Sequence, residues 1–97
     1  MRVSVRFFTV LREITGKREE TLRFPASTDV TVKVIIEKLA KKYGRSFVEY
    51  VYDHKTGNVK GFLQFLINGH STPPGHELDA ELANGDVLAI IPPVGGG

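Results

Sequence analysis

One amphipathic stretch, TVKVIIEKLAKKYG at residues 31–44, decides what this chain can fold into. Its apolar residues recur at intervals of three and four, which places them in one stripe along a helix: Val32, Ile35, Ile36, Leu39, Ala40 and Tyr43. Thr31 is a suitable N-cap, and Gly44 is expected to end the helix in a left-handed conformation. We therefore predict a helix over residues 31–43.

The segments before this helix alternate between apolar and polar residues, which is typical of half-buried strands. In residues 2–11 the alternation places Phe7 on the apolar face and Phe8 on the opposite, polar face. Thr21–Phe24 alternates again, and Gly16 lies in a turn between the two runs. We predict an antiparallel hairpin with a long loop.

The segments after the helix indicate two further strands. Residues 62–67 alternate and are followed by Asn68-Gly69, a strong hairpin signal, while Asn84-Gly85 leads into the apolar run at residues 86–91. Residues 45–61 are the hardest part to interpret, and we expect a short helical turn and an irregular excursion there.

The resulting order is strand, strand, helix, loop, strand, turn-rich segment, strand. One helix cannot cover both faces of a four-stranded sheet, so one face is expected to pack on the helix while the other stays largely exposed. The sequence thus predicts an α+β roll with a mixed sheet of four to five strands on one main helix. We expect a single domain over residues 1–97, with a flexible C-terminal tail at residues 92–97.

Composition excludes several classes of function. The 97 residues include no cysteine, which rules out disulfide scaffolds, thiolate metal sites, iron–sulfur clusters and cysteine nucleophiles. A formal net charge of +2 is too small to indicate a nucleic-acid or membrane surface. No apolar stretch is long enough for a membrane span, and no signal-peptide pattern opens the chain, so a cytoplasmic location is expected.

The last residues, PPVGGG, combine a stiff element with a freely adaptable one. Pro92 and Pro93 favour an extended path and should lift the chain off the sheet. Gly95, Gly96 and Gly97 can pass through a narrow channel in almost any conformation, so a terminal carboxylate could reach the active site of another protein. The alternative is a frayed terminus without a role.

A tail of this kind needs a partner that also holds the body of the domain, because ordering three glycines costs about 1–2 kcal/mol each. Phe8 is the one large apolar residue on the polar face of the first strand. In the last strand both alternating sets of side chains are apolar, although only one set can lie under the helix. The other set, which includes Ile91, should face another protein.

Four stretches together resemble the small subunit of molybdopterin synthase, within the β-grasp, ubiquitin-like sulfur-carrier proteins. They are VRFFTVLREITG at residues 5–16, the predicted helix, INGH at residues 67–70 and NGDVLAIIPPVGGG at residues 84–97. The most specific element is an apolar pair followed by Pro-Pro-Val-x-Gly-Gly, with Gly95 in the variable position. The similarity covers nearly the whole chain and is loosest over residues 45–61.

The resemblance implies a definite chemistry. An activating enzyme of the ubiquitin-activating type, using ATP and magnesium, would adenylate the carboxylate of Gly97, which then becomes a thiocarboxylate. The large synthase subunit would transfer that sulfur to a pterin precursor, so this chain supplies substrate rather than catalytic residues. In the family pattern Gly96 and Gly97 carry the reaction. The expected partner-binding residues are Phe8, Ile91, Pro92, Pro93, Val94 and Gly95.

Other candidate chemistry in the sequence is weak. The three histidines, His54, His70 and His76, are scattered, and only His76 has carboxylates at ligand spacing nearby, those of Glu77 and Asp79. No metal site and no bound cofactor are therefore expected. Glu19, Glu20 and Glu81 are expected on solvated faces. No nucleophile–base triad can be assembled.

Two other functions remain open from the sequence alone. The chain could be a protein modifier, in which the activated Gly97 forms an isopeptide bond with lysines of other proteins. It could also be a plain interaction module with an inert tail. The first alternative requires the same Gly-Gly terminus and the same kind of activating enzyme as the sulfur carrier.

Overall fold

The computed structural model describes residues 1–93. Strands and helices follow one another along this part of the chain in an order that places the main helix between two groups of strands. The elements are β1 (Arg2–Phe7), α1 (Val10–Thr15), β2 (Glu19–Arg23), α2 (Val32–Tyr43), α3 (Arg45–Val51), β3 (Gln64–Ile67), β4 (His70–Ser71), a 3-10 turn (Glu77–Asp79) and β5 (Val87–Ile91).

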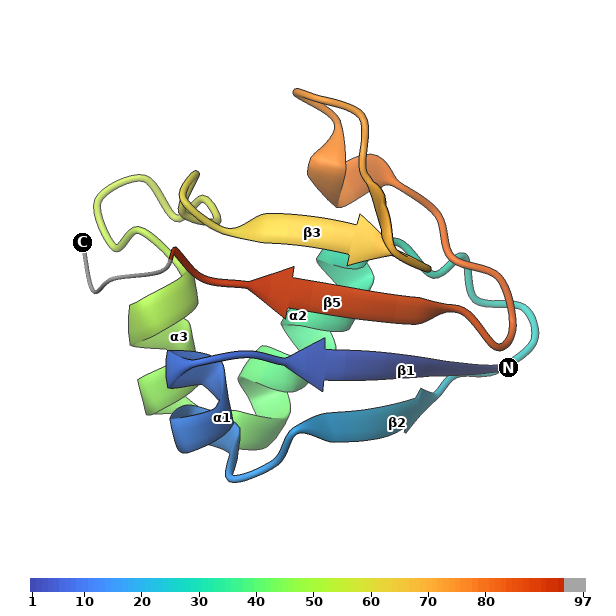
Figure 1. The fold of residues 1–97 in the computed structure, drawn as a ribbon, viewed down its shortest axis with the longest axis horizontal. Helices are drawn as coiled ribbons and strands as arrows, with labels where there is room; N and C mark the ends of the chain where they lie inside the picture. Colours follow the sequence, from blue (N-terminus) through green and yellow to red (C-terminus); the bar gives the residue numbers. More distant parts are fainter. Residues whose placement is uncertain (94–97) are drawn as a thin grey trace.

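The strands form one mixed sheet in the order β2-β1-β5-β3-β4 (Figure 1). The first and last strands, β1 and β5, pair in parallel at the centre, and the other neighbours are antiparallel. The prediction of an α+β fold with a mixed sheet on one main helix is confirmed. The sheet has five strands because the chain after the Asn68-Gly69 turn adds the two-residue strand β4.

The main helix forms as its apolar stripe predicts. Thr31 caps it, since its hydroxyl accepts a hydrogen bond from the amide of Val34 at 3.2 Å. At the other end Gly44 has a positive φ of 72°, but its ψ of −143° lies outside the left-handed helical region. The expected left-handed cap is therefore wrong in detail, because α3 begins at the next residue and the chain must turn into it.

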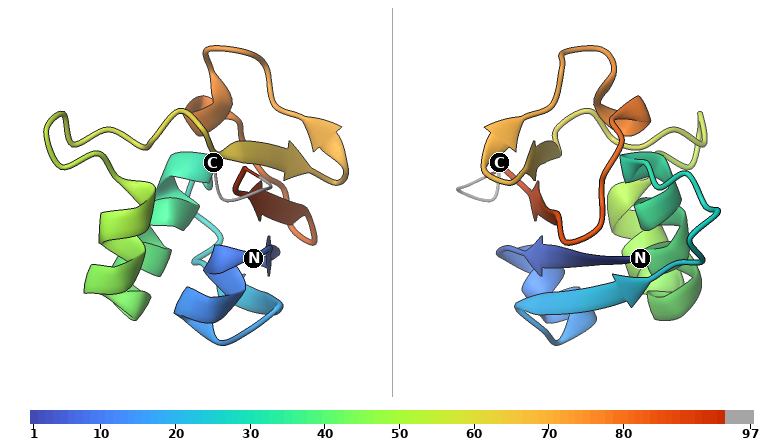
Figure 2. Two further views of the ribbon diagram at one scale, coloured as in Figure 1. Left: turned by 60° about the vertical axis from the view of Figure 1, so that its left-hand side comes forward. Right: turned by 90° about the vertical axis from the view of Figure 1, so that its right-hand side faces the viewer.

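The core lies between one face of the sheet and the helices, which gather on one side of it (Figure 2). The main helix buries the residues of its stripe that point at the sheet: Val32, Ile35, Ile36 and Leu39. The strands contribute alternate residues to the same cluster: Val3, Val5, Phe7, Leu22, Phe65, Leu88 and Ile90. This helix-covered face of the sheet is called the covered face below, and the opposite side the open face.

Two helices occupy segments where the sequence indicated less order. The predicted long loop between the first two strands contains α1, which buries Leu11 and ends at Gly16 in the left-handed conformation. Residues 45–51 form the seven-residue helix α3 rather than a short turn, because Phe47 and Val51 lie on one helical face and are buried.

One charged residue lies inside rather than on a solvated face. Glu20 on β2 is 7% exposed and points at the end of α2, so its expected exposure is wrong. Its carboxylate accepts hydrogen bonds from Lys42, Tyr43 and Lys17. Burial opposes ionisation of this carboxyl, but the three donors outweigh it and hold the pKa of Glu20 below its ordinary value. The buried carboxylate thereby ties β2 to α2.

Candidate functional site

The open face of the sheet holds a hollow of about 580 Å³ that brings the two predicted contact residues together. Phe8 and Ile91 both line it, and both are partly buried. The floor between them is apolar and comes from the same face of β3 and β5: Leu66, Val87 and Ala89. Arg6 and Glu19 add charges of opposite sign to the lining.

Strand register explains why these residues meet. Phe7 on β1 lies beside Ile90 on β5 in the parallel pair, and both are buried in the core. Successive side chains of a strand point to opposite faces, so the next residues, Phe8 and Ile91, turn toward the open face. The sequence pattern therefore placed these two residues correctly, and the structure adds that they share one hollow.

Phe8 lies between two arginines. The guanidinium carbons of Arg6 and Arg12 are 5.5 and 5.4 Å from the centre of its ring, within the range of cation–π attraction. The Nε of Arg12 also donates a hydrogen bond to the carbonyl of Phe7 at 3.0 Å. Neither arginine was predicted from the sequence, although the position of Arg6, two residues before Phe8 on the same strand face, indicates its contact with the ring.

The backbone beside Phe8 is strained. Thr9 has φ 47° and ψ −121°, a conformation that a β-branched residue rarely adopts and that costs on the order of 1–3 kcal/mol. This sharp turn ends β1 and starts α1, so Phe8 stands at the last position before the chain leaves the sheet.

The two prolines after β5 differ in their exposure. Pro92 is buried and Pro93 is exposed. Pro92 continues the alternation of Leu88 and Ile90, which places its ring on the covered side. The expectation that both prolines stand off the sheet is thus wrong for Pro92. The remaining predicted site residues, Val94, Gly95, Gly96 and Gly97, lie outside the described residues.

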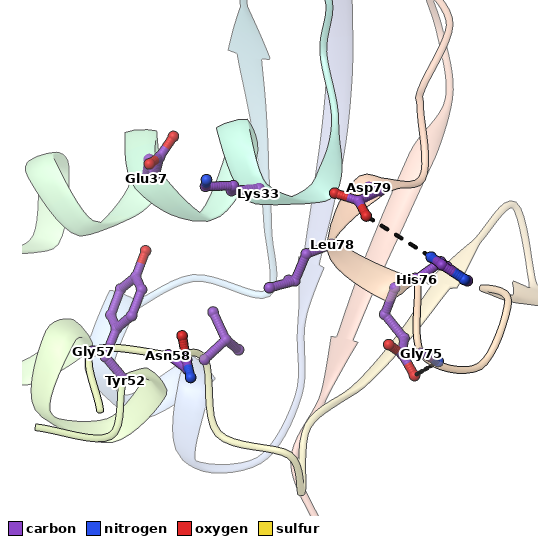
Figure 3. A pocket seen from close by; sticks show the side chains of 11 residues that line it. Lys33, Glu37, Tyr52, Gly57, Asn58, Gly75, His76, Leu78 and Asp79 are labelled. Atoms are coloured by element: carbon purple, nitrogen blue, oxygen red, sulfur yellow. Dashed lines mark hydrogen bonds and ion pairs between the residues drawn. The ribbon is translucent and has the colours of Figure 1, made fainter. Parts of the chain in front are cut away.

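A second hollow of about 440 Å³ lies between α2, the 52–59 segment and the 75–79 segment (Figure 3). Its lining mixes both charges, with Lys33 and Glu37 from α2 and an exposed His76–Asp79 pair whose Nδ1 and Oδ2 atoms are 4.0 Å apart. Burial, and then the nearby Glu37, raise the pKa of Tyr52, so its hydroxyl stays protonated here. Neither Phe8 nor Ile91 belongs to this hollow.

Within residues 1–93, no group of three or more histidine, cysteine, aspartate or glutamate side chains could hold a metal ion. In the same part of the chain no helix combines the length and apolar character that a membrane span requires.

Comparison with family models shows to which protein family the chain belongs. The model described as the ThiS family matches residues 5–97. The chain belongs to the ThiS family. It is thereby a small ubiquitin-like protein of the sulfur-carrier family, as the resemblance implied.

The relatives of this ThiS-family protein include a protein named as a modifier and one named as a sulfur carrier subunit. It is 28% identical over 97 residues to small archaeal modifier protein 3 of Haloferax volcanii, with 100% of both chains covered. It is 29% identical to the molybdopterin synthase sulfur carrier subunit of Caenorhabditis briggsae, covering 98% of this chain and 96% of the relative. The crystal structure of SAMP1 from Haloferax volcanii superposes with a TM-score of 0.80 at 26% identity and 100% coverage of both chains. These comparisons confirm the β-grasp fold.

Proposed function

We propose that this protein is the sulfur-carrier subunit of a molybdopterin synthase, and that Gly97 is its reacting residue. The observation that carries the proposal is the apolar hollow in which Phe8 and Ile91 meet. This hollow lies on the open face beside the end of β5, the strand that runs into Pro-Pro-Val-Gly-Gly-Gly. The relationship to a molybdopterin synthase sulfur carrier subunit supports the assignment.

The chemistry starts from an unreactive group. A terminal carboxylate is ionised at neutral pH and is a poor electrophile. Attack of its oxygen on the α-phosphorus of ATP releases pyrophosphate and leaves an acyl adenylate, which is a mixed anhydride. Hydrosulfide supplied by the sulfur donor then attacks the acyl carbon, displaces AMP and leaves the thiocarboxylate at Gly97. Magnesium and the catalytic residues for these steps belong to the activating enzyme, whereas this chain contributes the reacting terminus.

The body of the domain supplies the binding energy in this proposal. Ordering each tail residue in a channel costs about 1–2 kcal/mol. Burial of a large apolar side chain gains about 1.5–3 kcal/mol, so contacts at Phe8 and Ile91 offset most of that cost. Pro93 directs the chain away from the sheet, and Val94 and Gly95 would fill the channel ahead of Gly96 and Gly97. The partners are the activating enzyme and the large synthase subunit, in the cytoplasm.

Intact mass spectrometry tests the proposal. The purified chain is incubated with its activating enzyme, ATP and a sulfur donor, and its mass is expected to rise by the difference between one sulfur and one oxygen atom. A variant without Gly96 and Gly97, which no longer ends in Gly-Gly, serves as the control and should keep its mass. An unchanged wild-type mass, under conditions in which the enzyme activates another carrier, would refute the proposal.

A protein modifier is the second candidate. It is favoured by the 28% identity to a small archaeal modifier protein over the full chain. In that function the adenylated Gly97 reacts with a lysine amine of another protein, forming an isopeptide bond and releasing AMP. Remnants of this chain on lysines of cellular proteins after digestion with trypsin would support it. Each remnant would be residues 61–97, because no Lys or Arg follows Lys60. A chain that gains sulfur but leaves no such remnants is a carrier only.

A further inference from the structure

The end of the sheet where β5 finishes carries a second exposed apolar group. Phe62, just before β3, is 46% exposed, the highest value among the exposed large apolar residues within residues 1–93. Its ring centre is 5.8 Å from that of Tyr50 on α3. The amine of Lys60 lies 5.7 Å from the Phe62 ring and 5.9 Å from the Tyr50 ring. Phe62, Tyr50 and Lys60 are called the aromatic–lysine cluster below.

Strand register places this cluster beside the exit of the tail. In the antiparallel pair of β3 and β5, Gln64 lies beside Ile91, so residues just before Gln64 lie at the end of the sheet where Pro92 begins. Phe8 stands at the same end on the other side of β5, because β1 runs parallel to β5. Figures 1 and 2 show the start of β3, the end of β5 and α3 gathered at this end of the molecule. Aromatic residues therefore border the end of β5 on both sides, with Phe8 partly buried and Phe62 exposed.

The fold does not require Phe62 to be apolar. Its neighbours Leu63 and Phe65 turn inward and are 7% and 4% exposed, whereas Phe62 turns outward. Lys60 donates a hydrogen bond to the carbonyl of Glu49 at 3.1 Å, and within residues 1–93 it forms no ion pair. The cluster thus presents an aromatic surface topped by a positive charge that no carboxylate of this part of the chain neutralises.

We propose that the aromatic–lysine cluster is a second docking surface, and that it binds the enzyme that adenylates Gly97. The inference rests on the proposed function, because that enzyme has to take in the tail. A channel that receives a chain leaving between Phe8 and Phe62 must be bordered by protein on both sides. The β1 side of its mouth would contact Phe8 and Ile91. The β3 side would offer an apolar recess for Phe62, bordered by carboxylates that face Lys60.

Steady-state adenylation with wild-type and variant chains tests this surface. Phe62→Ala is expected to raise the KM for the carrier about tenfold and to leave kcat unchanged, because the tail itself is intact. Lys60→Glu should raise KM at least as much, and the increase should shrink at high salt. Val48→Ala is the matched control, since Val48 is 39% exposed on α3 and should not change KM.

The outcomes separate the inference from the proposed function. If Phe62→Ala and Lys60→Glu keep the wild-type KM while Phe8→Ala raises it, the second docking surface is refuted and the carrier function stands. If the wild-type chain itself releases no pyrophosphate with an activating enzyme that is competent on another carrier, the second docking surface and the carrier function are both refuted. A raised KM in Val48→Ala of the same size would also overturn the inference, because the effect would then not be specific to the cluster.

Discussion

Two doublets of identical residues, Phe7-Phe8 and Ile90-Ile91, lie side by side at the end of the central strand pair. The first member of each is buried under the helices, with Phe7 0% and Ile90 1% exposed. The second member of each lines the hollow on the open face. The same side chain therefore lies in the core or in the hollow of the open face according to the parity of its position in a strand.

The two faces differ in what covers them. Helix α2 closes the covered face with four buried aliphatic residues. Among the described elements no helix lies over the hollow of the open face, although its floor is also apolar. An apolar surface that the chain leaves open, with Arg6 and Glu19 in its lining, suits a protein partner better than it suits solvent.

The largest predicted contrast is in stability. Phe7→Ala removes a fully buried ring and should lower the free energy of unfolding by about 3–5 kcal/mol. Phe8→Ala removes a partly exposed ring with two cation–π contacts, so its cost should be under about 1 kcal/mol. Urea denaturation followed by circular dichroism measures both. Equal losses for the two variants would show that the faces do not differ as described.

The next contrast is in partner binding. Ile91→Ala should weaken binding of the activating enzyme about 10- to 100-fold, because its side chain lines the hollow next to Phe8. Ile90→Val, a small change on the covered face, should cost about 0.5–1.5 kcal/mol of stability and leave affinity unchanged. Titration calorimetry on both folded variants gives the affinities. Should Ile90→Val weaken binding more than Ile91→Ala, the open face is not the docking surface.

Sequence patterns predicted what depends on periodicity alone. The stripe of α2 and the alternation in β1 and β5 were sufficient for the layers, and for placing Phe8 and Ile91 on the open face. Pro92 was missed because a proline pair suggests a stalk, whereas strand alternation continues one residue past β5 and buries the first ring.

Tertiary partners decided the features that the sequence could not reveal. Glu20 is buried because Lys42 and Tyr43, more than twenty residues away, satisfy its carboxylate. Helix α1 is only six residues long and packs its Leu11 into the core, which its local sequence signals too weakly. The Phe62–Tyr50 contact joins a turn to α3, and no spacing along the chain indicates it.

Substitution of Glu20 tests how much its buried carboxylate stabilises the covered face. Glu20→Gln keeps the size of the side chain but removes its attraction to Lys42 and Lys17, and we expect a loss of about 1–2 kcal/mol because both lysines are partly solvated. The pKa of Glu20 is lowered in the folded state. Its stabilisation is therefore complete above the unfolded pKa near 4.5 and is lost as pH falls through the lower folded value.

The measurement is the free energy of unfolding between pH 3 and pH 7 for both proteins. The wild type should lose more stability than Glu20→Gln as the solution becomes acidic. Parallel curves would mean that Glu20 is not held ionised by its neighbours. Glu20→Gln should leave docking unchanged, because Glu20 faces α2 and does not line the hollow.

The smallest effect is expected at Asp86, which lies just before β5 and outside the lining of the hollow. Its carboxylate accepts hydrogen bonds from the Ala83 amide at 2.8 Å and the Asn68 side chain at 3.0 Å, and these bonds lower its pKa. Asp86→Asn should lower the free energy of unfolding by about 0.5–1.5 kcal/mol at neutral pH. The wild type should lose this stabilisation only as the pH falls below 3.8, the ordinary pKa of this carboxyl group. Affinity for the activating enzyme should be unchanged. A tenfold loss of affinity would extend the docking surface beyond Val87 into the turn that precedes β5.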